Sequence, residues 1–285
     1  MIHGPNRRTD PSELRDRPWR SLSDADLRTV EQVPSMLSRE ERQMYLWLAE
    51  NWDDEDNALI DLGAFVGGAS ASMAEGRRRA GRTGRVHAYD RFGAGEQLKE
   101  AFLYPLGVAP FDGVDILPLA QRLLSPWAPN VQFHKGDIED QTWRGGTISV
   151  LGIDAAKSPG ALDRIAEIFY PSLIPGRSII VQQDFLHWKV PWIAAHMQRM
   201  LHWFRPVACC PGNSVLFLCQ VLVDHHALEA GRVAALDDTC FLRDLRAMRS
   251  TLSGFGIDRR VAKLAESMAL NPGMRRSRDF HVRPP

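Results

Sequence analysis

The sequence predicts an α/β fold built on a doubly wound, mostly parallel sheet that ends in an antiparallel hairpin. Between residues 58 and 223, short apolar runs alternate with helical segments, and such continuous runs are typical of strands covered on both faces. The last two runs are separated only by Pro211, Gly212 and Asn213. That turn is too short for a crossover helix, so these two strands are expected to be antiparallel.

Local patterns predict helices at both ends of the chain and strands between them. Ser23 with Asp26 and Ser38 with Glu41 have the spacing of helix capping boxes, which predicts a helical cap over residues 1–57. Leucines and methionines at helical spacing predict a helical extension over 224–285, with a loose tail after Asn271. In the core, 58–223, strands are expected at 58–62, 85–89, 131–134, 147–153, 178–181, 207–210 and 214–223.

The composition excludes several classes of protein. The chain has 285 residues, with 35 Lys and Arg against 35 Asp and Glu, so no bulk positive field is available to hold nucleic acid. Residues 1–20 lack an apolar stretch, and the apolar run at 214–223 is about half a membrane span, so neither a secretory signal nor a membrane anchor is expected. Four cysteines without paired spacing favour a reducing compartment, and we expect the cytoplasm.

The two flanks carry net charges of opposite sign. Residues 1–57 hold 13 acids against 8 bases, whereas residues 225–285 hold 7 acids against 11 bases. The flanks can face each other within one chain or across a homodimer, or they can be two solvated surfaces. We favour the last interpretation, because surface charge governs association more than fold.

The most informative segment is Asp61-Leu-Gly-Ala-Phe-Val-Gly-Gly-Ala-Ser70, between the first expected strand and a helix. Its glycines at 63, 67 and 68 allow a sharp turn and a close approach to a ligand. The helix that starts near Gly68 offers amides to an anionic group. The glycine spacing differs from that of dinucleotide folds and of phosphate loops.

Two further acids strengthen the interpretation of this turn as a ligand site. Asp90 ends the second strand, where an acid accepts hydrogen bonds from ribose hydroxyls. Asp137 follows the third strand, where its carboxylate can pair with an adenine amine while Ile138 covers the ring.

These motifs together resemble class I S-adenosylmethionine-dependent methyltransferases. Within that class the sequence is most similar to the macrocin O-methyltransferase and cephalosporin-hydroxylase-like group, which acts largely on sugars and other small natural products. The resemblance covers about 58–223 and implies a seven-stranded Rossmann-like sheet whose last strand is antiparallel. The motifs that carry it are Asp61-Leu-Gly-x-x-x-Gly-Gly-x-Ser70, Tyr89-Asp90, Gly136-Asp137, Ile153-Asp154 and Leu173-Ile-Pro-Gly-Arg177.

The resemblance also implies where S-adenosylmethionine lies. Asp90 would bind the ribose, and Asp137 with Ile138 the adenine. The alternative for each glycine is a tight turn, and for Asp137 a helix cap. The remaining cofactor-binding residues, most of them around the methionine end, would be Asp61, Gly63, Phe65, Gly67, Gly68, Ser70 and Asp154.

A magnesium site is a second expectation at the ends of the fourth and fifth strands. In macrocin-type relatives, the positions of Asp154, Gln183 and Asp184 resemble a site made by one acid and an acidic pair. Gln183 replaces the first acid of that pair, so one formal charge is lost and the affinity for Mg²⁺ should fall. Metal binding stays open at this stage, and without a metal Asp154 and Asp184 would bind the substrate directly.

Methyl transfer to a hydroxyl needs a base, because a hydroxyl is a poor nucleophile until its proton is removed. Three residues can serve: Lys157, His187 and Asp184. The alternatives are a salt bridge from Lys157 to Asp154 and a polar loop position for His187. Nearby aromatic residues can form one wall of a substrate pocket or pack on a helix: Phe185, Trp188, Trp192 and Trp203.

We therefore expect an S-adenosylmethionine-dependent O-methyltransferase that acts on a hydroxylated small-molecule acceptor, with the flanks shaping the acceptor pocket. The alternative is a binding protein or partner subunit that keeps the fold without transfer, and methylation of nitrogen or carbon also stays open. A nucleotide-sugar or nicotinamide enzyme is disfavoured by the glycine spacing and by the closing hairpin.

Overall fold

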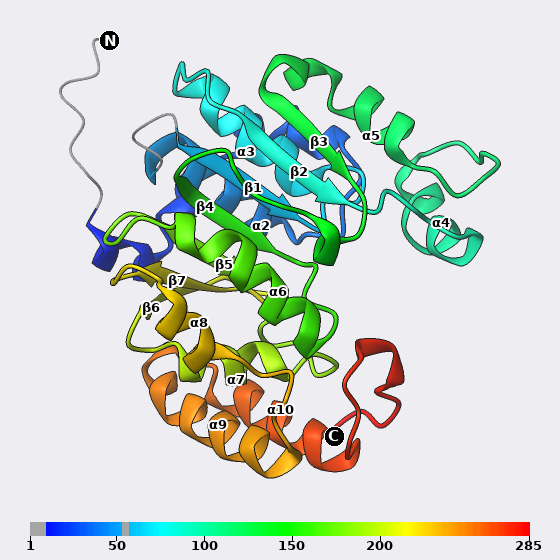
Figure 1. Ribbon diagram of the computed structural model, residues 1–285. Coiled ribbons are helices and arrows are strands. Elements are labelled where there is room, and N and C mark those ends of the chain that lie inside the picture. Colours follow the sequence, from blue (N-terminus) through cyan, green and yellow to red (C-terminus); the bar gives the residue numbers. More distant parts are fainter. Residues whose placement is uncertain (1–9, 53–56) are drawn as a thin grey trace. The chain divides into compact units, whose positions relative to one another are not determined.

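The computed structural model describes residues 10–52 and 57–285. The strands are β1 (Ala58–Leu62), β2 (Val86–Asp90), β3 (Val131–Lys135), β4 (Ile148–Ile153), β5 (Ile179–Gln182), β6 (Phe204–Cys209) and β7 (Val215–Cys219). They form one seven-stranded sheet in the order β3-β2-β1-β4-β5-β7-β6 (Figure 1). Strand β2 is parallel to β1 and β3, whereas β7 is antiparallel to β5 and β6. The predicted sheet with an antiparallel ending is confirmed.

The closing hairpin is confirmed, but its strand limits differ from the prediction. Strand β6 begins before residue 207, and β7 ends before residue 223. The backbone N–H of Gln220 donates to Trp203 at 2.7 Å and closes the ladder. Val221 and Leu222 follow as exposed residues, so their apolar character does not mark a buried strand.

Helices account for most of the remaining regular structure. None of them, in the part of the chain that the structure describes, is long and apolar enough to cross a membrane. The α-helices are α1 (Asp24–Leu27), α2 (Arg39–Trp47), α3 (Gly68–Arg79), α4 (Glu96–Phe102), α5 (Leu117–Leu123), α6 (Pro159–Phe169), α7 (Trp192–Arg199), α8 (His225–Gly231), α9 (Asp238–Thr251) and α10 (Asp258–Leu270).

The chain divides into two compact units. The first comprises Met1–Asp137 and Ile148–Leu151, and the second comprises Ile138–Thr147 and Gly152–Pro285. The helical N-terminal flank therefore belongs to the first unit and the helical C-terminal flank to the second. The domain boundaries expected at residues 57 and 223 stay predictions.

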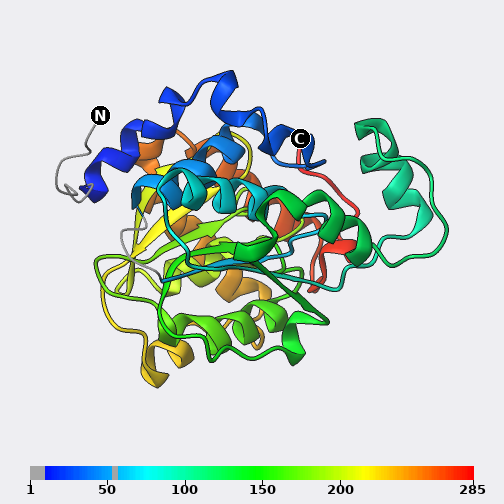
Figure 2. The same cartoon turned by 90° about the horizontal axis from the view of Figure 1, so that it is seen from above.

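In the first unit the N-terminal flank packs on the helix that follows the glycine turn. Both capping boxes form, with Asp26 and Glu41 reaching back to the residues that precede α1 and α2, as predicted. Helix α2 lies beside α3 (Figure 2). Gly76 of α3 permits this approach, because a Cβ there would lie 2.3 Å from the carbonyl oxygen of Leu46.

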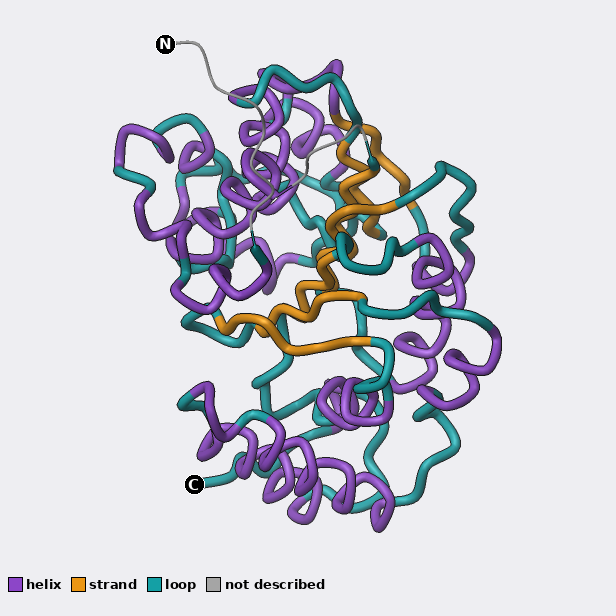
Figure 3. The backbone as a smooth tube through the Cα atoms, turned by 90° about the vertical axis from the view of Figure 1, so that its left-hand side faces the viewer, coloured by secondary structure: helices purple, strands orange, loops and turns teal. Residues whose placement is uncertain are grey.

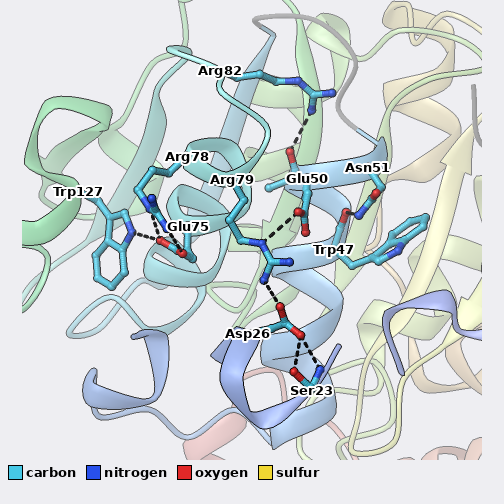
Figure 4. A network of polar contacts seen from close by, with 11 residues as sticks. Ser23, Asp26, Trp47, Glu50, Asn51, Glu75, Arg78, Arg79, Arg82 and Trp127 are labelled. Atoms are coloured by element: carbon cyan, nitrogen blue, oxygen red, sulfur yellow. Dashed lines mark hydrogen bonds and ion pairs between the residues drawn. The ribbon is translucent and has the colours of Figure 1, made fainter. Parts of the chain in front are cut away.

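Charged side chains reinforce this contact (Figure 4). Arg79 of α3 forms ion pairs with Asp26 at 2.8 Å and with Glu50 at 3.0 Å. Glu75 of the same helix is buried and accepts a hydrogen bond of 2.9 Å from Trp127 Nε1. The N-terminal flank is thus held to α3 by both apolar packing and paired charges.

In the second unit, α9 packs against α10 and α7 (Figure 1). The helices near the C-terminus are the purple coils in the lower part of Figure 3. The predicted loose tail after Asn271 is wrong. The Asn271 side chain donates to the carbonyl of Val282 at 2.8 Å and accepts from the amides of His281 and Val282 at 3.0 Å each. Phe280, in the middle of the tail, is fully buried. One buried amide side chain therefore fixes the last residues against the end of α10.

Candidate functional site

The glycine turn is a strained backbone segment between β1 and α3. Gly63 and Gly67 have φ values of 94° and 101°, which favour glycine, and Phe65 between them has φ 52°. The amides of Gly63 and Ala64 both donate to the carbonyl of Tyr89, at 2.8 and 3.0 Å. The turn is thereby tied to the end of the neighbouring parallel strand β2.

Asp90 holds two residues of left-handed conformation in place. One carboxylate oxygen accepts the N–H of Phe65 at 2.9 Å, and the other accepts the N–H of Phe92 at 2.6 Å. Phe65 and Phe92 have φ values of 52° and 50°. Left-handed backbone in a bulky residue is costly and persists where the surroundings enforce it, most often at functional sites. Each Asp90 oxygen keeps a second acceptor position, so the expected ribose contact stays a prediction.

Asp61 is a buried carboxylate directly before the turn. Its side chain is 1% exposed and accepts a hydrogen bond of 2.5 Å from the hydroxyl of Ser70 on α3. Burial raises the pKa of Asp61 to about 6, and the charge of Asp90 adds to this against the Ser70 hydrogen bond. A buried carboxylate of this kind gains stability when a cationic ligand group lies against it.

The other residues that were predicted to bind the cofactor differ in their surroundings. A Cβ at Gly67 would lie 2.4 Å from a methyl of Leu124, and one at Gly68 would lie 2.2 Å from the hydroxyl of Ser35. These two glycines therefore meet the protein's own side chains, which supports the tight-turn interpretation for them. Asp137 forms an ion pair with Arg91. Ile138 belongs to the second unit.

These residues fit the chemistry of S-adenosylmethionine. The cofactor has cationic, anionic and hydroxyl groups, and this turn offers two carboxylates beside the start of a 12-residue helix. Among the described residues, no side chain caps α3, whose N-cap is Gly67. Its first amides are thus suited to the cofactor's carboxylate, as anions commonly bind helix N-termini. Asp61, Asp90 and the first turn of α3 would hold the cofactor.

A second polar cluster lies in the second unit, around Lys157. Asp154 directly follows β4, and Asp184 lies two residues beyond β5. The ammonium of Lys157 lies 2.5 Å from Asp154 Oδ1 and 2.6 Å from Asp184 Oδ2. The structure thus brings together three of the predicted residues, and it shows the salt bridge that the sequence offered as the alternative to a base role for Lys157.

The charges in this cluster depend on one another. Burial opposes the charged form of Lys157, but the two carboxylates raise its pKa above the usual value. Burial also acts to raise the pKa of Asp184, and the Lys157 ammonium outweighs it, so that the pKa lies below the usual value. For Asp154, burial acts to raise the pKa, and the attraction of Lys157 opposes this. Lys157 is therefore a charged group at neutral pH and a poor candidate for the base.

The cluster around Lys157 is poorly suited to a divalent cation. Lys157 already places a positive charge between the two carboxylates, where a metal would need them as ligands. Gln183, the third expected ligand, supplies no negative charge. Within residues 10–52 and 57–285, no group of three His, Cys, Asp or Glu side chains converges as a metal site.

His187 connects the acidic cluster to a pocket. Its backbone N–H donates to the carbonyl of Asp184 at 2.9 Å, so the two residues share one turn. Burial lowers the pKa of His187, with a smaller opposing effect from Asp184, and the ring is neutral at pH 7. The Lys189 N–H lies 3.4 Å from Nδ1, a contact too long to fix one tautomer of the ring. His187 therefore remains the neutral base candidate.

The pocket beside His187 has a volume of about 430 Å³. Its lining includes residues that the sequence interpretation missed, Arg260, Lys263 and Arg283, and Trp188 contributes an aromatic wall as expected. Arg260 and Lys263 are three residues apart on α10, which puts them on one face of that helix. That spacing was a usable signal, but nothing in the sequence indicated that this face meets the loop after β5.

Comparisons with known proteins give likenesses of structure alone. No family model and no curated protein matches the sequence. The O-methyltransferase NovP aligns with 66% of this chain and 82% of its own, at 15% identity and a TM-score of 0.49. Cofactor-bound Rv0187 from MTB covers 75% and 99%, at 16% identity and 0.45. CalS11, a TDP-rhamnose 3′-O-methyltransferase of calicheamicin biosynthesis, covers 69% and 95%, at 15% and 0.42.

Proposed function

We propose that this protein is an S-adenosylmethionine-dependent O-methyltransferase that acts on a hydroxylated small molecule. The observation that carries the proposal is Asp90, whose carboxylate fixes the strained turn after β1 beside the buried Asp61. Strained backbone, a desolvated acid and an uncapped helix at adjacent ends of parallel strands are the features of a ligand site rather than of a plain connection.

In this proposal His187 is the general base. When bound, S-adenosylmethionine would supply an electrophilic methyl group to the acceptor oxygen, with its sulfur as the leaving group. His187 takes the proton that the acceptor hydroxyl loses, which leaves a methyl ether, S-adenosylhomocysteine and a protonated imidazole. Lys157 keeps Asp154 and Asp184 paired, so the charge that a metal would supply comes from the chain itself.

We further propose that the acceptor is a sugar or another small natural product and that the reaction takes place in the cytoplasm. The pocket beside His187 has the size of a small-molecule site. Cys209, Cys210, Cys219 and Cys240 are free thiols, which suits a reducing compartment.

Calorimetric titration with S-adenosylmethionine and S-adenosylhomocysteine tests the cofactor assignment. We expect both to bind, and Asp90→Ala to abolish binding because the turn loses its anchor. Absence of binding to either compound in the wild-type protein would overturn the proposal. A matched control is Asp115→Ala, which removes an exposed carboxylate paired with Lys135 and should leave the affinity unchanged.

The assignment of His187 as the base is tested separately, with an acceptor that the wild-type protein methylates. His187→Gln should lower kcat by about 10²- to 10⁴-fold while the affinity for S-adenosylhomocysteine stays unchanged. In the wild type, kcat/KM should rise with pH through the lowered pKa of His187 and be level at neutral pH. Full turnover by the variant would transfer the base role to Asp184.

A further inference from the structure

Three of the residues that line the pocket beside His187 are basic, and none is acidic. Arg260 and Lys263 reach it from α10 and Arg283 from the tail, and no carboxylate lines it. In the described part of the chain, Lys263 and Arg283 form no ion pair, and Arg260 donates to the neutral amide of Asn213 at 2.7 Å. The pocket therefore presents a concentration of positive charge to a ligand.

The backbone that carries Arg283 is fixed by buried contacts. Asn271 is 5% exposed and binds the backbone of His281 and Val282, directly before Arg283. Pro284, directly after it, is buried. The tail therefore presents Arg283 from an anchored backbone, which lowers the entropic cost of using it to bind a ligand.

The aromatic wall of the pocket is anchored to the same elements. The carbonyl of Trp188 accepts a hydrogen bond of 2.7 Å from Ser267 of α10. The ring of Trp188 meets the buried ring of Phe280 edge-on, with centroids 6.5 Å apart. Helix α10, the tail and the loop after β5 thus form one packed frame around the pocket. An apolar ring beside fixed cationic groups is a common arrangement for binding an amphipathic anion.

We propose that this pocket binds the methyl acceptor, and that the acceptor carries an anionic group, a carboxylate or a phosphate, held by Arg260, Lys263 and Arg283. The planar or ring part of the acceptor lies against Trp188, and its hydroxyl is directed to His187. This inference rests on the proposed function, and it adds the charge of the substrate. Guanidinium groups bind both carboxylates and phosphates through paired hydrogen bonds, so the shared chemistry is the anion.

Two pairs of probes measure how much the anionic group contributes to binding, apart from the rest of the acceptor. The first pair is 4-hydroxybenzoate and its uncharged amide, and the second is glucose 6-phosphate and glucose. Binding is measured by calorimetry and ligand-observed NMR, at constant ionic strength and with S-adenosylhomocysteine present. We expect at least one anion to bind about tenfold or more tightly than its neutral partner, and the pair with the larger ratio identifies carboxylate or phosphate. Equal binding within both pairs, or no binding by either anion, would overturn the proposal.

Substitutions in the pocket test whether the anion binds there. Arg260→Gln and Lys263→Met should each weaken binding of the preferred anion about tenfold. Arg259→Gln is the matched control, because Arg259 is the exposed neighbour of Arg260 on α10 and does not line the pocket. All these side chains are exposed, so the variants are expected to fold. An equal loss in the control, or wild-type affinity in both pocket variants, would contradict the assignment.

The two proposals fail in different ways. If S-adenosylhomocysteine binds and neither anion is preferred, the methyltransferase assignment stands and the anionic acceptor does not. If an anion binds with the expected dependence on Arg260 and Lys263 but S-adenosylhomocysteine does not bind, the pocket assignment stands and the proposed reaction is wrong.

Discussion

At the residue scale, Asp61 combines a cost in stability with a proposed role in binding. Its pKa rises from 3.8 to about 6 on folding, because burial disfavours the charged form. The folded state then binds more protons than the unfolded state between these pH values, so stability falls as pH rises through this window. A shift of this size corresponds to about 3 kcal/mol.

Asp61→Asn removes this titration and tests whether Asp61 lowers stability while it supports cofactor binding. Relative to the wild type, the variant should gain about 3 kcal/mol in the free energy of unfolding as pH rises from about 4 to about 7. Effects of the substitution that do not vary with pH cancel when urea unfolding of both proteins is compared at several pH values. The variant should also bind S-adenosylhomocysteine more weakly. A difference in stability that is constant with pH would show that Asp61 ionises normally.

Lys157 lies between the two carboxylates that the sequence offered as ligands for a possible divalent cation. Adding EDTA or Mg²⁺ should therefore leave the thermal stability of the wild type unchanged. Lys157→Ala leaves Asp154 and Asp184 without their counter-ion, so Mg²⁺ should raise the Tm of this variant. Lys135→Ala, which breaks the single exposed pair with Asp115, is the control and should not respond. A wild-type protein stabilised by Mg²⁺ would show that the metal displaces the ammonium.

Site residues could be predicted where the chemistry is local in sequence. Asp61 and the glycines belong to one ten-residue segment, and Asp90 ends the next strand, so the parallel pairing of β1 with β2 brings them together. Arg260 and Arg283 could not be assigned, because their place depends on how α10 and the tail pack against the loop after β5, which lies far earlier in the sequence. The ion pair of Lys157 was foreseen as an alternative, but its second partner, Asp184, depends on the neighbouring strand end.

At the element scale, one side chain anchors the C-terminal tail. Asn271→Ala removes the bonds to His281 and Val282 and should lower the free energy of unfolding by about 2 to 4 kcal/mol. Hydrogen exchange at residues 280–284 should become faster, and the preferred anionic probe should bind more weakly because Arg283 loses its support. Asn51→Ala, which removes one bond to the carbonyl of Trp47, is the control and should cost far less. Unchanged exchange in the tail would mean that the packing of Phe280 alone holds it.

The tail and the end of β7 show what local patterns miss. Helices and buried strands can be predicted from periodicity. A tail held by three hydrogen bonds of Asn271 has no repeating pattern, so its sequence predicts a loose segment. Conversely, the apolar residues Val221 and Leu222 were predicted to belong to a strand, although both side chains are exposed. Both differences arise because burial is a property of the folded chain and not of the residue type.

At the scale of the whole molecule, the two candidate ligand sites use residues of different compact units. The glycine turn, Asp61 and Asp90 belong to the first unit, whereas His187, Lys157 and the cationic pocket belong to the second. The sequence predicted the sheet that contains the strands of both, because alternating strands and helices leave few topologies. It did not predict the division, which passes through β4 and so is not marked by a linker.

Hydrogen exchange can follow the two sites separately in one protein. At about a hundred times its Kd, S-adenosylhomocysteine should stabilise the folded protein by about 2.7 kcal/mol and slow exchange at residues 61–70 and 86–92. The preferred anionic probe should instead slow exchange at 186–189 and 281–284. Asp90→Ala should lose the first pattern and keep the second, and Lys263→Met should do the reverse. Protection by S-adenosylhomocysteine confined to the second unit would place the adenosyl site away from the glycine turn and remove the basis of the proposed reaction.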